Sequence, residues 1–383
     1  MTTQSSQPNK LRVIIVGGGV AALETALALH DLAGELVELT VIAPNDQFFY
    51  RPMTVREPFA FGAAKRYPLQ PILDETNAKW VADGLSFVDP DKQIAHTNGG
   101  VELPYDVLTL AMGAKAHPRY THAITIDAAS MDETLHGIIQ DVEQGYVKSL
   151  AFVAPARMPW QLPMYELALM AAGRAYDMNV DLEVTIVTPE DAPLAIFGSG
   201  ASTGVAELLE RAKIQSINSA YAEVPRPGEV VINPGDRRLH FDRVIALPEL
   251  FGPSVRGIPL GENGFIRVNQ YGKVPDVGPI FAAGDVTNFA VKHGGISAQQ
   301  ADVAAESIAA LAGAPVTPKP FDPVIHGMLL TDSKPVYLTA HIAGGHGFSS
   351  EISDTPTWSP ATKIAAKYLA PSLDALDHEG VPR

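Results

Sequence analysis

The chain contains no cysteine among its 383 residues. This absence excludes disulfide bonds, thiolate nucleophiles, cysteine-ligated zinc and cysteine-ligated iron–sulfur clusters. Any redox chemistry must therefore come from a bound cofactor. The 11 histidines are scattered, and none forms an HExxH pattern or another tight ligand spacing, so we predict no metal site.

Long apolar runs and an excess of positive charge are also missing. No run approaches the ~20 apolar residues that a helix needs to span a bilayer. The first ten residues, MTTQSSQPNK, lack the layout of a secretion signal, so we predict a cytoplasmic protein. The 28 basic and 43 acidic residues give a net charge of −15, which argues against nucleic acid and anionic membranes as partners.

The first informative stretch is "LRVIIVGGGVAALETALALHDL", which predicts a strand, a glycine turn and a helix. Gly17, Gly19 and Ala22 fit G-x-G-x-x-A, in which the glycines allow a tight turn and close approach of a pyrophosphate. Small residues at such a junction also serve packing alone, but here a second strand, "VELTVIA", follows in the expected order. The acid expected at its end is absent, and Asn45 or Asp46 is the alternative ribose ligand.

Two later stretches strengthen this interpretation. "LPYDVLTLAMGAKAH" predicts a strand that ends at Ala111–Gly113, and "VGPIFAAGDVTNFAVKHGGISAQQ" predicts a strand that ends in Gly284 and Asp285. A carboxylate at a strand end accepts hydrogen bonds from sugar or ribityl hydroxyls, although Asp285 by itself would equally cap a turn. A long helix is predicted from about Gly295, and the free amides of Gly295 and Ile296 suit electron-rich flavin oxygen atoms.

These motifs together resemble the two-dinucleotide-domain flavoproteins of the pyridine nucleotide-disulfide oxidoreductase type. "VIAPNDQFFYRP", "LPMYELA", "AAGDVTNFAVKHGG" and "WSPATKIAAKYLAP" are similar to the branch of sulfide:quinone oxidoreductase, flavocytochrome c sulfide dehydrogenase and type II NADH dehydrogenase. The resemblance implies an α/β fold of two Rossmann-like domains, the second inserted in the first. The implied parts are an FAD-binding domain (10–119 and 246–315), a degenerate NAD-like domain (120–245) and a C-terminal flavin-covering segment (316–383).

The resemblance also implies FAD as the cofactor and distributes residues along it. Gly17, Gly19 and Ala22 would hold the pyrophosphate. The remaining implied contacts are Arg51 and Pro52 along the flavin side, Val81 or Ala82 at the adenine, Gly113 at the end of the FAD domain, Gly284 and Asp285 at the ribityl–phosphate region, and Gly295 and Ile296 at the ring.

One loop departs from the relatives. NAD(P)H-using relatives carry a glycine-rich loop where this chain has "RMPWQLPM" at 157–164, in which Trp160 and two prolines would obstruct a pyrophosphate. Sulfide-oxidising relatives carry a redox cysteine there, and this chain has none. A second glycine-rich stretch, "GSGASTG" at 198–204, is predicted to be a loop and helix start. We therefore predict that Met158, Trp160 and Met164 form an apolar pocket wall over the flavin.

Three polar residues are catalytic candidates. Glu166 stands where relatives carry a glutamate near the reactive flavin nitrogen and would move a proton there, or else it is a first-turn helix acid. Lys363 would stabilise a reduced anionic flavin or pair with Glu166, or else it is a solvated lysine. His293 precedes the Gly294–Gly295 helix start and would relay protons beside the ring. Tyr50 and Trp358 complete the predicted substrate pocket.

The C-terminal stretch "TKIAAKYLAPSLDALD" has a short apolar stripe. It is too short and too weakly basic for strong interfacial binding, so membrane contact is predicted to be peripheral at most. The stripe is predicted to serve packing or a homodimer contact, and its members are Ile364, Tyr368, Leu369 and Leu373.

Three functions remain open from the sequence. The first is an FAD-dependent oxidoreductase that moves electrons between a small substrate and a quinone or another small carrier by non-thiol chemistry. The second is an NAD(P)H-dependent reductase with unconventional nicotinamide binding, with Arg157 or Arg174 on the phosphates. The third is a flavin-binding sensor or assembly protein without turnover.

Overall fold

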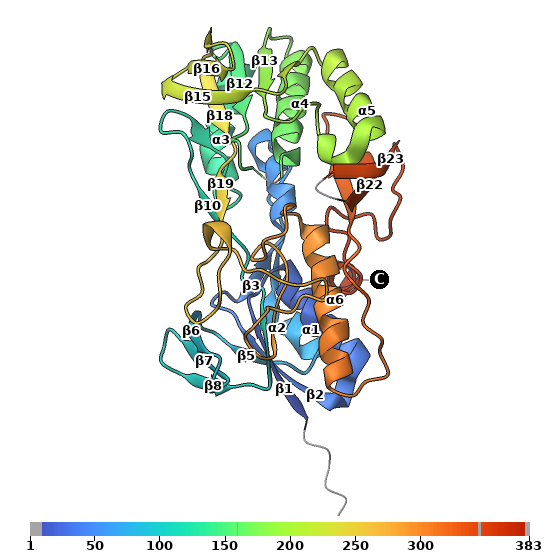
Figure 1. Cartoon of the computed structure of the whole chain (residues 1–383). Coiled ribbons are helices and arrows are strands. Elements are labelled where there is room, and N and C mark those ends of the chain that lie inside the picture. The colour runs from blue at the N-terminus through green and yellow to red at the C-terminus, as the bar shows by residue number, and fades with distance from the viewer. Residues whose placement is uncertain (1–9, 159, 344–345, 380–383) are drawn as a thin grey trace, which may run out of the picture.

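A computed structural model of the chain describes residues 10–158, 160–343 and 346–379, so Pro159 of the 157–164 loop lies outside it. Two parallel sheets lie toward opposite ends of an elongated molecule (Figure 1). Strands of the first sheet come from before and after the second sheet in sequence, so the second unit is an insertion. The predicted α/β fold with two Rossmann-like units is confirmed, whereas the boundaries at 119/120, 245/246 and 315/316 stay predictions.

The first sheet is parallel and buried on both faces. In its central strand, Val13 and Ile15 belong to the core under the helices, and Ile14 and Val16 belong to the core on the opposite face, as the period of two in a strand requires. Two helices, α1 (Val20–Ala33) and α6 (Gly294–Leu311), pack together on one face. The strand order is β20 (Ile280–Ala282), β9 (Val107–Leu110), β1 (Leu11–Val16), β2 (Val37–Ile42) and β5 (Lys79–Val81).

The opposite face of this sheet is covered by a three-stranded antiparallel sheet. Val88 and Ala95 of that sheet are buried in the same core as Ile14. Its strands are β6 (Leu85–Asp89), β7 (Ile94–Thr97) and β8 (Glu102–Pro104).

The inserted sheet repeats this arrangement. Helices cover one face, and an antiparallel sheet covers the other through Val153 and Val230 of a shared core. The parallel strands run β11 (Ile124–Thr125), β18 (Arg243–Ala246), β12 (Ser149–Val153), β13 (Glu183–Val187) and β14 (Gln215–Ile217). The covering elements are α3 (Met131–Glu143), α4 (Leu162–Asp177), α5 (Gly198–Arg211), β15 (Tyr221–Arg226), β16 (Glu229–Asn233) and β17 (Arg237–His240).

Two connections join the units. They pair as antiparallel strands, β10 (Lys115–His117) with β19 (Glu249–Phe251), where the chain enters and leaves the insertion. The shorter elements are β3 (Gln47–Phe49), β4 (Arg66–Pro68), α2 (Leu69–Glu75) and the 3-10 helices η1 (Gly34–Leu36), η2 (Arg51–Phe59), η3 (Ala195–Phe197) and η4 (Glu262–Gly264).

The C-terminal part packs on both units. An antiparallel sheet, β21 (Val324–Leu329), β22 (Val336–Ala343) and β23 (His346–Ser353), lies against α5 of the insertion (Figure 1). The glycines of "GSGASTG" permit this contact, because a Cβ on Gly200 would lie 2.8 Å from the Ser350 Oγ. The Ala201 amide donates to that oxygen at 3.0 Å. The predicted helix start at Gly198 is confirmed, and its first turn faces β23.

The final helix, α7 (Leu369–Glu379), packs on α1. Ile364, Leu369 and Leu373 are buried in the core of the first unit, so this part of the predicted apolar stripe serves internal packing rather than a dimer contact. Within the described residues, none of the helices combines the length and apolarity needed to cross a bilayer. The cytoplasmic location stays a prediction.

Candidate active site

The turn between β1 and α1 has the geometry that its glycines predict. Gly17 has φ +133°, and a Cβ there would lie 2.3 Å from the Ala111 carbonyl oxygen, so no other residue fits without backbone movement. Gly19 is the N-cap of α1, and a Cβ on it would meet no atom within 4 Å. Ala22 is fully buried where the helix packs. The turn therefore leaves open space above unpaired helix amides, which suits a phosphate.

The loop between β20 and α6 brings a carboxylate to the same edge of the sheet. Gly284 has φ +82°, and a Cβ there would lie 2.9 Å from the Ala21 Cβ, which holds the loop against α1. The amide of Gly284 donates to the Gln300 Oε1 at 2.8 Å. Asp285 accepts a hydrogen bond from the Ser297 hydroxyl at 3.3 Å. Burial raises the pKa of the Asp285 carboxyl, while the charges of Lys292 and Arg51 and the hydroxyl hydrogen bond oppose the shift.

Gln300, Ser297 and Lys292 were not predicted as site residues. Lys292 is buried, its Nζ lies 4.1 Å from the centre of the Phe265 ring, and burial lowers its pKa to about 8. The only signal in the sequence was their closeness to "AAGD", which does not show which side chains turn toward the loop.

The predicted adenine and ribose contacts lie at the end of β2 and β5. Asn45 and Asp46 are exposed, as a ribose ligand requires in a ligand-free chain. The Val81 carbonyl already accepts the amides of Ala43 and Asp83 at 3.1 and 2.8 Å, so it is engaged within the protein. Ala82 is exposed beside it.

The observed features fit a dinucleotide of the FAD type. The free space above Gly19, the uncapped starts of α1 and α6, and the carboxylate of Asp285 lie at the carboxyl ends of β1 and β20, two parallel strands of the same sheet with β9 between them. That edge is where open α/β sheets bind ligands. Gly113, with φ +74°, follows β9 at the same edge.

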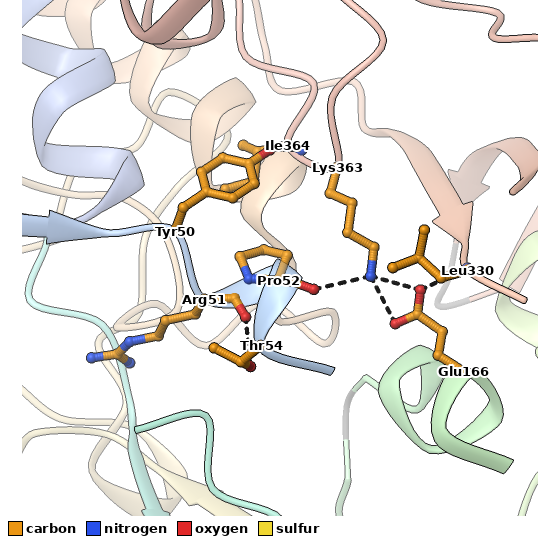
Figure 2. A network of polar contacts seen from close by, with 8 residues as sticks. All are labelled: Tyr50, Arg51, Pro52, Thr54, Glu166, Leu330, Lys363 and Ile364. Atoms are coloured by element: carbon orange, nitrogen blue, oxygen red, sulfur yellow. Dashed lines mark hydrogen bonds and ion pairs between the residues drawn. The ribbon is translucent and has the colours of Figure 1, made fainter. Parts of the chain in front are cut away.

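A buried ion pair lies where the two units and the C-terminal segment meet (Figure 2). The Lys363 Nζ lies 2.6 and 2.8 Å from the two carboxylate oxygens of Glu166, and it donates to the Pro52 carbonyl oxygen at 3.0 Å. The Leu330 amide donates to the Glu166 Oε1 at 2.8 Å. Both charged side chains are almost fully buried, with 4% and 0% exposure. The structure therefore realises the predicted pairing of these two residues.

The environment of the pair brings the pKa values of its two members closer together. Burial raises the pKa of the Glu166 carboxyl and lowers the pKa of the Lys363 ammonium, and each partner's charge opposes the shift of the other. Moving one proton from Nζ to the carboxylate removes two buried charges at once. The pair is thus suited to hold a proton and to release it.

A cavity of about 370 Å³ opens beside Lys363. Tyr50 lines it, as predicted, and its hydroxyl accepts the Ile364 amide at 3.1 Å. Burial raises the pKa of Tyr50. The cavity wall combines charged and apolar side chains. It includes Met53, Arg56, Phe61, Lys65, Tyr67, Met328, Leu369, Leu373 and Asp377.

The other predicted pocket residues lie elsewhere. Met164 is fully buried in the core of the insertion and cannot form a ligand-accessible wall, because α4 turns its side chain inward. Met158 and Trp160 are partly buried against the same core and are not among the residues that line this cavity. Trp358 packs 5.1 Å from the His326 ring, and its Nε1 donates to the Thr362 carbonyl oxygen at 2.8 Å.

His293 is the N-cap residue of α6 and is 8% exposed. Its ring centre lies 4.5 Å from that of Trp160, so the unusual loop packs on this histidine. Its Nδ1 has no hydrogen-bond partner among the described residues. Burial, with a smaller contribution from His326 and Lys363, lowers the pKa of His293 to about 3, so the ring is neutral at physiological pH.

A polar network of side chains lies beside the start of α4. The Thr188 hydroxyl donates to the Gln161 Oε1 at 2.6 Å, and the Tyr165 hydroxyl donates to the Glu190 Oε2 at 2.9 Å. Glu190 follows β13, where a Rossmann domain places its ribose-binding acid. Glu190 was not among the predicted site residues, although "VTIVTPED" contains this acid after the predicted strand.

Of the two arginines suggested for nicotinamide phosphates, Arg174 is not placed to bind them at the start of α4. Arg174 lies in the last turn of the helix, bonded to the Phe59 carbonyl oxygen at 2.6 Å, about 18 Å along the axis from its start. Arg157 donates to the Asn263 Oδ1 at 3.3 Å. The role predicted for Arg174 is therefore wrong, because the helix carries it away from the strand ends.

Comparisons with known proteins agree with this architecture. The sequence profile of the pyridine nucleotide-disulphide oxidoreductase family matches residues 165–307. The sulfide-quinone reductase of Aquifex aeolicus (strain VF5) is 24% identical over 303 residues, which are 72% of this chain and 68% of the relative. The chain is thus similar to the pyridine nucleotide-disulphide oxidoreductase family over the matched residues. It is a flavin-dependent oxidoreductase, and the predicted likeness to the sulfide:quinone oxidoreductase branch is confirmed.

The chain shares its fold with solved structures. The sulfide:quinone oxidoreductase from Aquifex aeolicus superposes with a TM-score of 0.77 at 20% identity, over 90% of this chain and 87% of that chain. An NAD-dependent persulfide reductase from A. fulgidus superposes with a TM-score of 0.60 at 19% identity, over 88% of this chain and 65% of that chain.

Proposed function

We propose that this oxidoreductase uses FAD to pass electrons between a small substrate and a quinone or another small carrier, by chemistry that needs no thiol. The proposal rests on one observation above the others, the Lys363–Glu166 pair beside a cavity of about 370 Å³. A buried proton-holding pair next to a ligand-sized cavity suits a reaction that moves protons together with electrons.

The chain's own residues would hold FAD at the first sheet. Gly19 and the start of α1 would take the pyrophosphate, and Asp285 would accept hydroxyl hydrogen bonds from the ribityl–phosphate region. Gly295 and Ile296, at the start of α6, would meet the ring. When bound, the flavin accepts two electrons from one small molecule and gives them to another.

Lys363 and Glu166 would manage the protons of this exchange. A quinone that gains two electrons also takes up two protons. Lys363 lines the cavity, and its Nζ would donate one of them while solvent supplies the other; the Glu166 carboxylate, held by the Leu330 amide, fixes the position of the Nζ. The Pro52 carbonyl oxygen orients the same ammonium.

The two donor routes used by relatives do not fit this chain. A persulfide route needs cysteine, and the sequence contains none. A nicotinamide needs a free strand end and helix start in the insertion, whereas Gln161 and Glu190 there are engaged by Thr188 and Tyr165.

We also propose a cytoplasmic location, small-molecule partners and at most peripheral membrane contact.

The test is an anaerobic absorbance titration of the purified holoprotein. NADH, NADPH, sulfide and a reduced quinone are added in separate experiments, and the flavin band is followed. Bleaching by the reduced quinone, with none by millimolar nicotinamide or by sulfide, is the expected result. Rapid bleaching by NADH or NADPH would refute the assignment, and a flavin that only dithionite reduces would indicate a protein without turnover.

A matched pair of variants connects the titration to the site. Lys363→Met removes the proton-holding group at the cavity and is expected to slow reduction by the quinol. Lys367→Met, four residues later and exposed, is the control and should leave the rate unchanged. Equal rates in both variants would remove Lys363 from the mechanism.

A further inference from the structure

A pair of buried acids, separate from the Lys363–Glu166 ion pair, lies between α1, α6 and the start of α7. Glu24 on α1 is fully buried, and its carboxylate accepts the backbone amides of Tyr368 and Leu369 at 2.9 and 2.6 Å. Asp302 on α6 hydrogen-bonds to Glu24, and its Oδ1 is buried without a donor among the described residues. The two carboxyl groups thus share a site directly beneath the first turn of α7.

The helix that Glu24 holds is also a wall of the large cavity. Leu369 and Leu373 of α7 line that cavity, and Asp377 near its end joins them. Beyond its first amides, α7 is also held by Ser372, whose hydroxyl donates to Glu75 at 3.0 Å, and by Asp377, which pairs with Lys65 at 2.6 Å and accepts the Tyr67 hydroxyl at 3.2 Å. The Lys65–Asp377 pair is partly exposed and contributes little, so the two bonds to the fully buried Glu24 are the most desolvated polar contacts of α7.

Two carboxylates in one buried site cannot both be ionised without strong repulsion, so one of them keeps its proton. The bonding pattern assigns the charge to Glu24, because two amides and the start of a helix favour an anion there. Asp302 then carries the proton and donates it to Glu24. Burial, followed by the charge of Glu24, raises the pKa of Asp302 to about 8.

The surrounding charges only partly offset this repulsion. Lys367 is exposed, and its Nζ donates to the Tyr368 hydroxyl at 2.8 Å rather than to either carboxylate. The Tyr368 hydroxyl donates in turn to the exposed Asp31 at 3.2 Å. Glu306, one turn further along α6, adds negative charge to the side of Asp302.

We propose that the Glu24–Asp302 pair is a proton-controlled clasp that holds α7 closed over the cavity and releases it when the shared proton is lost. The closed state binds one proton that an open, solvated pair would not hold. Opening therefore becomes easier as pH rises, by up to about tenfold per pH unit above the ordinary carboxyl range, and stops changing above about pH 8. Access to the cavity would follow the pH of the surroundings in the same way.

The absence of native cysteine makes the test direct, because an introduced thiol is the only one in the chain. Leu373→Cys places it on the buried, cavity-facing side of α7, and Ala375→Cys places it on the exposed side. Alkylation of each holoprotein by a maleimide is followed between pH 6 and 9. The ratio of the two rates removes the pH dependence of thiol reactivity itself. We expect this ratio to rise toward pH 8 and then level off.

Substitutions at the pair separate the clasp from general loosening. Asp302→Asn keeps the shape and a donor toward Glu24 but cannot ionise, so the ratio should stay low and flat across this range. Asp31→Asn, an exposed acid of the same cluster, should keep the rise. Melting temperatures of all variants verify folding. An unchanged rise in Asp302→Asn, or a flat ratio in the Leu373→Cys parent, would overturn the proposal, and neither outcome depends on the identity of the substrate.

Discussion

At the scale of single residues, Glu166 is a position where substitution is expected to lower the stability of the protein strongly. Its carboxylate is the only buried anion bonded to the Lys363 ammonium among the described residues. Removing one partner of a buried ion pair leaves a desolvated charge without compensation, whereas removing both leaves an apolar contact.

Glu166→Gln is therefore expected to lower the free energy of unfolding by about 3–5 kcal/mol. Chemical denaturation of samples with equal flavin content measures the change. The double variant Glu166→Gln with Lys363→Met is the control and should recover part of the loss, because no unpaired charge remains. A double variant less stable than the single one would show that packing, not charge, dominates here.

Glu190 supports a prediction on pH. Burial raises the pKa of this carboxyl to about 7, and the folded state therefore binds a proton that the unfolded chain has released. Stability is highest below the ordinary glutamate pKa and falls as pH rises to about 7, by up to about 1.4 kcal/mol per pH unit. Glu190→Gln should flatten the decline, and the exposed control Glu183→Gln should not. Parallel curves for the wild type and Glu190→Gln would contradict the assignment.

At the scale of elements, the β1–α1 turn separates glycines with different roles. Gly17 is required by the fold, since its positive φ and the Ala111 carbonyl leave no room for a Cβ. Gly19 faces open space, so the protein itself tolerates a side chain there. The same motif thus combines a structural glycine with one whose demand comes from a ligand.

Gly17→Ala is accordingly expected to lower the stability of the protein by about 1–3 kcal/mol through backbone strain. Gly19→Ala should leave thermal stability of the flavin-free protein nearly unchanged and weaken FAD binding about tenfold or more, which corresponds to about 1.4 kcal/mol. Melting curves and fluorescence titration with FAD measure the two effects. FAD affinity unaffected by Gly19→Ala would argue against a pyrophosphate at this turn.

The N-terminal ends of α4 and α5 differ from those of a dinucleotide-binding domain. Both helices begin at strand ends of the inserted sheet, where a dinucleotide domain binds phosphates. Here Ser350 of β23 bonds to the Ala201 amide of α5, and Gln161 at the start of α4 is bonded to Thr188. At α5, an internal hydroxyl thus accepts an amide of the helix start, and at α4 the N-cap side chain is bonded within the protein.

At the scale of the whole molecule, the proposed flavin site is assembled from segments far apart in sequence. The turn at Gly17, the strand end at Gly113 and the loop at Asp285 meet only in the folded chain, and a ligand between them stabilises the folded state alone. Bound FAD at a concentration one hundred times its Kd would stabilise the folded state by about 2.7 kcal/mol. Removal of FAD is therefore expected to lower the melting temperature.

Readdition of ligands tests which part of the cofactor matters. FAD should restore the melting temperature, and FMN, which lacks the adenylate half, should restore less of it. Differential scanning fluorimetry at matched ligand concentrations makes the comparison. Equal recovery with FMN would mean that the pyrophosphate turn does not contribute to binding.

The sequence by itself determined the features encoded within a dozen or so neighbouring residues. A strand, a glycine turn and a helix follow one another in "LRVIIVGGGVAALETALALHDL", so the local pattern was sufficient to predict the β1–α1 turn and the class of fold. The absence of cysteine and the bulky "RMPWQLPM" loop were also readable, because an obstructing side chain needs no tertiary context to be recognised.

Only the tertiary structure decided which side chains meet. Glu166 and Lys363 are 197 residues apart, and Glu24 and Leu369 are 345 apart, so no local pattern specifies either contact. Apolar side chains suit a core and a ligand wall equally well in sequence; the structure buries Met164 in the insertion's core, whereas the pocket-wall role of Met158 and Trp160 stays a prediction. Burial in the folded chain also changes the acidity of these groups, because removal from water lowers the pKa of Lys363 and raises the pKa of Glu166.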